Sequence, residues 1–170
     1  AGYCELNYTP QTADGDVEID RALSINANFE ISLQLWSYLV REGGLPEPKN
    51  FINTTPHLSF VWGEENVEFL RRRHEKLSAH HLCKEMEYSE DPAGLEQWMP
   101  LVMKDRDPSE KVAATRIAHG TDVDFGSLAR NMVKNLQDDD NFTLCLNHEV
   151  NDFDHAKDGS WHVRVKDRKS

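Results

Sequence analysis

Apolar residues recur at intervals of three and four between residues 22 and 40, the spacing of one face of an α-helix. The members of this pattern are Ala22, Ile25, Phe29, Leu33, Trp36 and Val40. Gly43 and Gly44 follow this pattern, with Pro46 beyond them, and these residues favour the end of a helix. The pattern therefore predicts a helix that ends just before the glycine pair.

Three shorter elements are predicted in the next sixty residues. The apolar run at residues 58–62 predicts a buried strand, and the spacing of apolar positions between residues 67 and 77 predicts a second helix. A short third helix is expected at residues 95–99, ending near Pro100. The polar segment 105–108 predicts an exposed loop that is suited to serve as a linker.

The last sixty residues mix helical and strand patterns. Residues 125–136 predict a helix that Asp122 or Asp124 can cap. Apolar and polar positions then alternate in three segments, at residues 142–146, 150–153 and 161–165, with a turn signal at Asp158–Gly159. We expect an α+β fold: a mostly helical region followed by a helix and a three-stranded antiparallel meander.

Charge and composition narrow the classes of partner. With 170 residues and 38% hydrophobic content, the chain can bury one core. The 30 acidic against 19 basic residues give a net charge of −11, which disfavours nucleic-acid binding and means that a small dianion needs a local cation. No apolar run has the length of a membrane-spanning helix, so any membrane contact is expected to be peripheral. Cys4, Cys83 and Cys145 have no repeating spacing, which favours reduced, cytoplasmic thiols.

Three stretches occur in an order that resembles one enzyme family. They are CELNYTPQ at residues 4–11, FINTTPHLSFVWG at residues 51–63 and KVAATRIAHGTDVDFGSLAR at residues 111–130. Together they resemble the malate:quinone oxidoreductases, FAD enzymes that oxidise L-malate to oxaloacetate and pass the electrons to membrane quinone. The resemblance implies FAD as cofactor, L-malate and quinone as partners, and a peripheral position on the cytoplasmic face of the inner membrane.

The resemblance also implies how the chain is organised. Residues 1–18 would follow the flavin loop, residues 19–110 would form a mostly helical substrate-side region, and residues 111–170 would belong to the FAD domain. The nine glycines contain no Gly-x-Gly-x-x-Gly spacing, which a FAD pyrophosphate site requires. We therefore expect an internal fragment that binds no FAD alone, is inactive, and self-associates through the uncovered meander.

Oxidation of a secondary alcohol needs a base near the hydroxyl and cations near the carboxylates. His57 is the leading candidate for the base under the resemblance, although a partly buried His bonded to a carbonyl is an equal reading of the residues alone. His119 is a second candidate, or a solvated turn residue. Arg116 stands among small and apolar residues, so its guanidinium needs a partner, which is either a substrate carboxylate or an internal one such as Asp122 or Asp124.

Further candidates are weaker. Asn7 and Tyr8 can bond a carboxylate, although a turn before Pro10 explains them equally well. Thr54, three residues before His57, is a further candidate for a polar contact with the substrate. His74, His80, His81 and Cys83 lack paired metal-ligand spacing, so no metal site is predicted. Two alternatives to the malate enzyme stay open: another FAD-dependent 2-hydroxy-acid oxidoreductase of the 2-hydroxyglutarate type, and a folded fragment without catalysis.

Overall fold

The computed structural model describes residues 6–168, apart from the side chain of Asn7. The chain divides into two compact units, residues 1–131 and 132–170, which are described separately. The first unit contains the short 3₁₀ helices η2 (Leu6–Tyr8) and η3 (Pro48–Asn50) in addition to its α-helices and strands. Helices and small antiparallel sheets make up both units, so the predicted α+β class is confirmed.

Helix α1 (Asp20–Arg41) is the longest element and confirms the first predicted helix. It ends where Gly43 adopts a φ of 80°, in the left-handed region that favours glycine. There the N–H of Gly44 donates to the Leu39 carbonyl at 2.8 Å, as expected of a helix that ends through a left-handed glycine. The predicted stop at the glycine pair is therefore confirmed.

A three-stranded antiparallel sheet forms the centre of the first unit. Its order is β2 (His57–Trp62), β4 (Val112–Ile117) and β3 (Glu87–Ser89), so β4 is hydrogen-bonded along both edges. Strand β2 confirms the predicted strand, but only Ser59 and Val61 are buried in it, and Trp62 is 55% exposed. The predicted division at residue 110 concerns regions of a parent enzyme and stays a prediction, but within this chain strands from both sides of residue 110 share one sheet.

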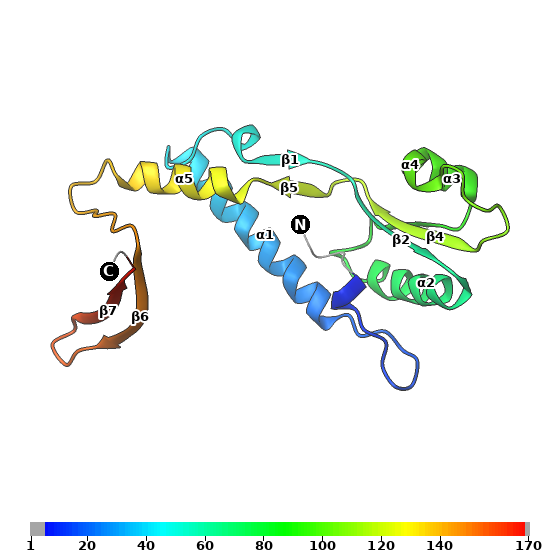
Figure 1. Cartoon of the computed structure of the whole chain (residues 1–170), viewed down its shortest axis with the longest axis horizontal. Coiled ribbons are helices and arrows are strands. Elements are labelled where there is room, and N and C mark those ends of the chain that lie inside the picture. The colour runs from blue at the N-terminus through cyan, green and yellow to red at the C-terminus, as the bar shows by residue number, and fades with distance from the viewer. Residues whose placement is uncertain (1–5, 169–170) are drawn as a thin grey trace. The chain divides into compact units, whose positions relative to one another are not determined.

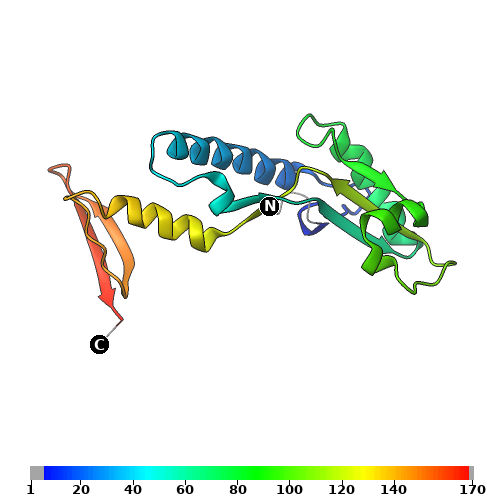
Figure 2. The same cartoon turned by 90° about the horizontal axis from the view of Figure 1, so that it is seen from above.

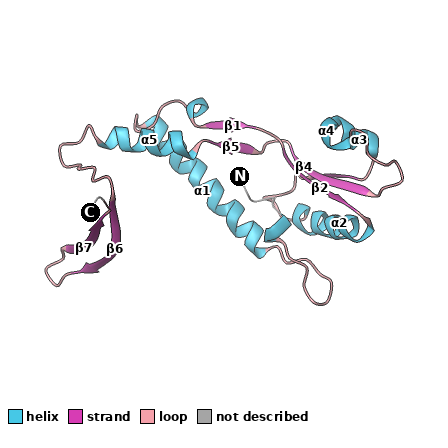
Figure 3. Ribbon diagram, viewed as in Figure 1, coloured by secondary structure: helices cyan, strands magenta, loops and turns pink. Residues whose placement is uncertain are grey.

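A second pair, β1 (Ile52–Thr54) with β5 (Thr121–Val123), continues the ribbon of β2 and β4 (Figures 2 and 3). Between the two ladders, residues 55–56 oppose residues 118–120, so one strand carries an extra residue, as in a β-bulge. The N–H of Thr55 donates to the Gly120 carbonyl at 2.9 Å. A Cβ on Gly120 would lie 2.5 Å from the Thr55 carbonyl oxygen, so only glycine fits this crossing.

Helices cover both faces of the three-stranded sheet. Helix α2 (Glu64–Ser78) lies on one face, and α3 (Pro92–Trp98) with the short α4 (Pro100–Met103) lies on the other (Figure 1). Ala113 packs with the α2 cluster, whereas Ala114, the next residue of β4, packs with the α3 cluster. These small side chains let a helix approach each face closely. The second and third predicted helices are confirmed, and α4 was not predicted.

A buried arginine ties the N-terminal segment to α2. Arg73 has no exposed surface, and its Nε donates to the hydroxyl of Thr9 at 2.7 Å. Thr9 is also fully buried, and its hydroxyl donates to the Leu6 carbonyl at 3.0 Å. Apolar periodicity does not identify Arg73, because the burial of its charge depends on a partner 64 positions away in the chain.

Helix α5 (Phe125–Leu136) confirms the helix predicted near residue 125, and Asp124 is its cap. The Ser127 N–H and hydroxyl donate to the Asp124 carboxylate at 2.8 and 2.6 Å, and these bonds hold the pKa of Asp124 below its usual value. Of the two predicted caps, Asp124 is therefore the one used.

The second unit contains one hairpin, β6 (His148–His155) with β7 (Trp161–Asp167). The expectation of a third strand is wrong for the described residues, because residues 142–146 pair with no other strand. Alternating apolar and polar residues suit an extended chain, but a strand also needs a neighbour with free backbone groups. Leu146 is 67% exposed, and Asn147 turns the chain with a φ of 60°. The predicted apolar face of the hairpin is exposed, with Phe153 at 63%.

Gly120→Ala tests the close approach at the bulge. We expect a loss of about 1–3 kcal/mol of unfolding free energy, because the added methyl meets backbone atoms that cannot rotate away. Gly94→Ala is the matched control, since its Cβ would meet only side-chain atoms, Asp91 Oδ2 at 3.3 Å and Ser89 Oγ at 3.5 Å, and alanine favours the helix. Urea denaturation measures both. Equal stability of Gly120→Ala and the unmutated chain would contradict the assignment.

Candidate functional site

A pocket with a volume of about 370 Å³ lies beside the bulge on the α3 face of the sheet. It is formed by six residues from the loop between β1 and β2, from β2, from the end of α3 and from β4. These residues are Thr55, Pro56, Leu58, Gln97, Trp98 and Arg116. The arginine is the one charged residue among these six, so the pocket suits an anionic group.

Arg116 stands near the end of β4, with Leu58 of β2 and Glu87 of β3 opposite it on the two sides. Its Nη1 donates to Glu87 Oε1 at 3.1 Å, and its guanidinium carbon lies 5.6 Å from the centre of the Trp98 ring. The side chain is 30% exposed. The expected need for a partner is met by a carboxylate within the chain, but that carboxylate belongs to Glu87 and not to Asp122 or Asp124.

His57 lies on the other face of the same sheet. In the ladder it pairs with Ile117, whereas Leu58 pairs with Arg116, and successive residues of a strand point to opposite faces. Ile117 packs against the cluster of α1 and α2, and His57 does not line the Arg116 pocket. The structure therefore does not bring His57 and Arg116 into one pocket.

His119 also lies away from Arg116. Its side chain is 78% exposed, and its Nε2 is 4.0 Å from Glu85 Oε2. It borders a separate pocket of about 260 Å³ that also contains Ile117, His81 and Cys83. The solvated turn position that was one of the two readings of His119 agrees with this exposure.

The remaining predicted contacts are dispersed. Tyr8 packs against the α1–α2 cluster, and the Arg21 guanidinium carbon lies 4.9 Å from its ring centre. Thr54 pairs with Thr121 in the β1–β5 ladder and is exposed, and it is the next residue, Thr55, that lines the pocket. The side chain of Asn7 lies outside the described part. Among the predicted site residues whose side chains the structure describes, Arg116 alone lines the pocket.

Three residues that matter here were not identified from the sequence. Glu87 could not be identified because its position opposite Arg116 depends on the register between β3 and β4. Trp98 lies in the third predicted helix and packs beside Leu95 and Met99, but its ring also faces the guanidinium. Gln97 precedes it on the exposed side of α3 and lines the pocket.

No group of three or more metal-ligating side chains gathers anywhere in the described part of the chain. His74 Nε2 lies 2.9 Å from the Met86 carbonyl oxygen, and its ring stacks on Tyr88 with centres 5.4 Å apart. Cys83 is buried, and burial raises the pKa of its thiol. These contacts explain His74 and Cys83 as parts of the core.

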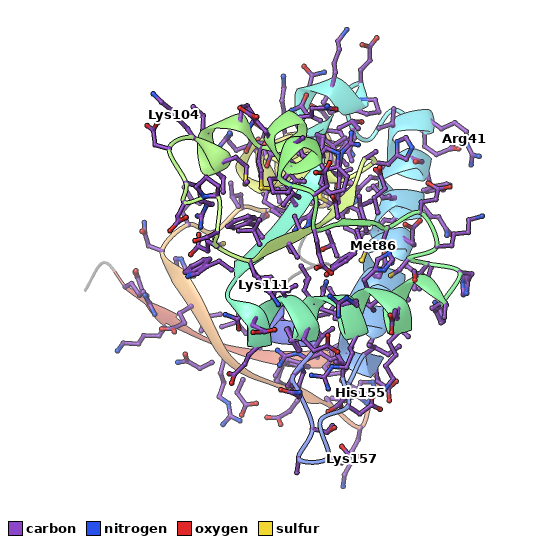
Figure 4. The ribbon with its side chains drawn as sticks, turned by 90° about the vertical axis from the view of Figure 1, so that its right-hand side faces the viewer. Arg41, Met86, Lys104, Lys111, His155 and Lys157 are labelled. Carbon is purple, nitrogen blue, oxygen red and sulfur yellow. The ribbon has the colours of Figure 1, made fainter. Side chains whose placement is uncertain are left out.

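The starts of α2 and α5 do not suit a FAD pyrophosphate. Gly63 leads from β2 into α2, but the first turn of α2 carries Glu64 and Glu65, which repel phosphate. Lys111 donates to Glu64 at 2.6 Å and lies beside α2, as Figure 4 shows. At the start of α5, the Asp124 carboxylate occupies the cap position. Neither junction provides the free N–H groups and positive field that a pyrophosphate requires.

Comparison with known proteins gives a consistent result. The family model described as malate:quinone oxidoreductase (Mqo) matches residues 1–170. The chain is 63% identical over its whole length to the "Probable malate:quinone oxidoreductase" of Hahella chejuensis. It is 62% identical, over 98% of its length, to the protein of the same name from Methylobacillus flagellatus. Each match covers 34% of the relative's length. It is 50% identical, again over 98% of its length, to "Probable malate:quinone oxidoreductase 1" of Pseudomonas aeruginosa, covering 32% of that protein.

The chain thus spans about one third of the length of these curated bacterial relatives. Among the helices that the structure describes, none combines the length and the apolar character needed to cross a bilayer.

Proposed function

The chain belongs to the malate:quinone oxidoreductase family, and we propose that it is part of an enzyme that oxidises L-malate to oxaloacetate and delivers the electrons through FAD to a membrane quinone. The match over residues 1–170 carries this proposal. The enzyme would meet its quinone as a peripheral protein on the cytoplasmic face of the inner membrane. A 2-hydroxyglutarate-type activity would need the same kind of cation, but the relatives' names favour malate.

We assign the recognition of a malate carboxylate to Arg116. A chain with a net charge of −11 repels a dianion, so a local cation is needed wherever the substrate is bound. Arg116 supplies that cation in a pocket, and its side chain is largely shielded from solvent. A guanidinium binds a carboxylate through two parallel N–H bonds, which fixes the orientation of the ligand as well as its position.

The pocket of Arg116 does not identify the base that accepts the hydroxyl proton of malate. His57 and His119 stay predictions as proton acceptors, and neither lines the pocket of Arg116. The rate and pH profile of an intact enzyme carrying His57→Asn would test the first of them. Asn7, Tyr8 and Thr54 likewise stay predictions as substrate contacts.

The isolated chain is expected to bind no FAD tightly and to oxidise no malate. The starts of α2 and α5 place carboxylates where a pyrophosphate would need N–H donors. The purified chain should lack the visible absorbance band of oxidised flavin, both as purified and after incubation with FAD and gel filtration. Stoichiometric flavin, or malate-dependent dye reduction by this chain alone, would contradict the expectation.

Self-association of the isolated chain is expected through the β6–β7 hairpin. Phe153 and Val163 face each other across the hairpin, and each of these apolar side chains is more than half exposed. The ion pair between Arg164 and Asp152 lies on the opposite, polar face. Sedimentation should show dimers or larger species, and Val163→Lys should reduce them. The control His162→Lys adds the same charge on the polar face. A monomeric unmutated chain would contradict this expectation.

Arg116→Ala in an intact enzyme of the family should lower kcat/KM for L-malate by about 30-fold to 1,000-fold. This range corresponds to about 2–4 kcal/mol of lost transition-state binding from a bidentate contact. Arg106→Ala is the matched control, because Arg106 also lies over an aromatic ring, that of Phe60, and pairs with a carboxylate, that of Glu110. Unchanged malate kinetics with a lowered melting temperature would make Arg116 a structural residue.

A further inference from the structure

The cation of the pocket already holds a carboxylate of its own chain. Glu87 lies directly opposite Arg116 in the β3–β4 ladder, and its Oε1 accepts a hydrogen bond of 3.1 Å from Nη1. This bond engages one of the five N–H donors of the guanidinium. Both side chains reach solvent, with exposed fractions of 30% for Arg116 and 47% for Glu87.

A ligand carboxylate is chemically the same group as the side chain of Glu87. If a ligand takes the position of Glu87 on the guanidinium, the internal ion pair has to break. If the ligand binds another edge of the guanidinium while Glu87 stays, two negative charges lie within a few ångströms of each other and repel. Glu87 therefore opposes the binding of a carboxylate by either route.

The guanidinium keeps a second contact when Glu87 leaves. The face of Trp98 lies 5.6 Å from the guanidinium carbon, a distance at which a cation is attracted to the ring. Trp98 is itself packed in the core cluster of α3, beside Leu95 and Met99. The cation therefore remains at the pocket during an exchange of one carboxylate for another.

We propose that Glu87 is a built-in competitor that lowers the affinity of the Arg116 pocket for carboxylate ligands. The inference rests on the proposed recognition of malate by Arg116 and adds a residue that sets how tightly the substrate is held. Exposed ion pairs contribute little free energy, so Glu87 attenuates binding and does not prevent it.

Glu87→Gln tests this assignment, because the amide has nearly the same size and can still accept a hydrogen bond but has no charge. The probe is L-malate, titrated into the isotope-labelled chain at constant ionic strength while the indole N–H resonance of Trp98 is followed by NMR. Trp98→Phe identifies that resonance. We expect the Kd of Glu87→Gln to be about 2–5-fold lower than that of the unmutated chain.

Glu90→Gln is the matched control. It removes the same charge from the same segment, but Glu90 accepts from Arg71 and Tyr88 and lies outside the Arg116 pocket. Its Kd should equal that of the unmutated chain. An equal gain in both variants would indicate a general charge effect and overturn the proposal. Weaker binding by Glu87→Gln, or no saturable shift in any of these proteins, would overturn it as well.

The two experiments distinguish a wrong substrate role for Arg116 from a wrong role for Glu87. If Arg116→Ala leaves malate kinetics of the intact enzyme unchanged while Glu87→Gln tightens malate binding to the chain, the proposed substrate role fails and the competition stands. If Arg116→Ala lowers kcat/KM while Glu87→Gln leaves the Kd unchanged, the substrate role stands and the competition fails.

Discussion

Strand β4 is the constraint on which the first unit depends, because it is bonded along both edges and covered by helices on both faces. Its first four residues are buried, and burial is only partial from Arg116 onward. A charged side chain can therefore stand in the central strand only near its end, where the guanidinium reaches solvent. Arg116 stands at the point of the strand where burial becomes partial.

The segment that faces the bulge between the two ladders forms one side of the pocket. Gly120 packs against the backbone of Thr55, and the two residues of β1–β2 that oppose the bulge, Thr55 and Pro56, line the pocket. A side chain at residue 120 would push these walls apart. The same crossing fixes the register of β2, which places Leu58 beside Arg116 and turns His57 to the other face.

Periodicity in the sequence was sufficient for four helices, for β2 and for the β6–β7 hairpin, whereas β1, β3, β4 and β5 were not predicted. The four longer helices and the strand at residues 58–62 were predictable because each has a clear apolar face or an apolar run. The meander was predicted with one strand too many, because alternation in residues 142–146 does not supply a pairing partner. The fully buried Arg73 was missed because burial of a charge depends on a distant partner, here the hydroxyl of Thr9.

The candidate site was predictable only in part, because the neighbours of Arg116 depend on the register of the strands that pair with β4. Arg116 was identifiable as a cation in an apolar segment, but its pairing with Glu87 joins residues 29 positions apart. Likewise, the separation of His57 from Arg116 follows from a ladder that no local pattern specifies. Chemistry that depends on one residue type can be read from the sequence, whereas chemistry that depends on which strand residues face each other cannot.

The most direct test of the carboxylate-binding role of Arg116 is a crystal structure of an intact enzyme of this family with L-malate or a non-reactive dicarboxylate bound. The account predicts one ligand carboxylate within hydrogen-bonding distance of the Arg116 guanidinium, beside Trp98. A ligand bound elsewhere, with Arg116 still paired to Glu87, would contradict it.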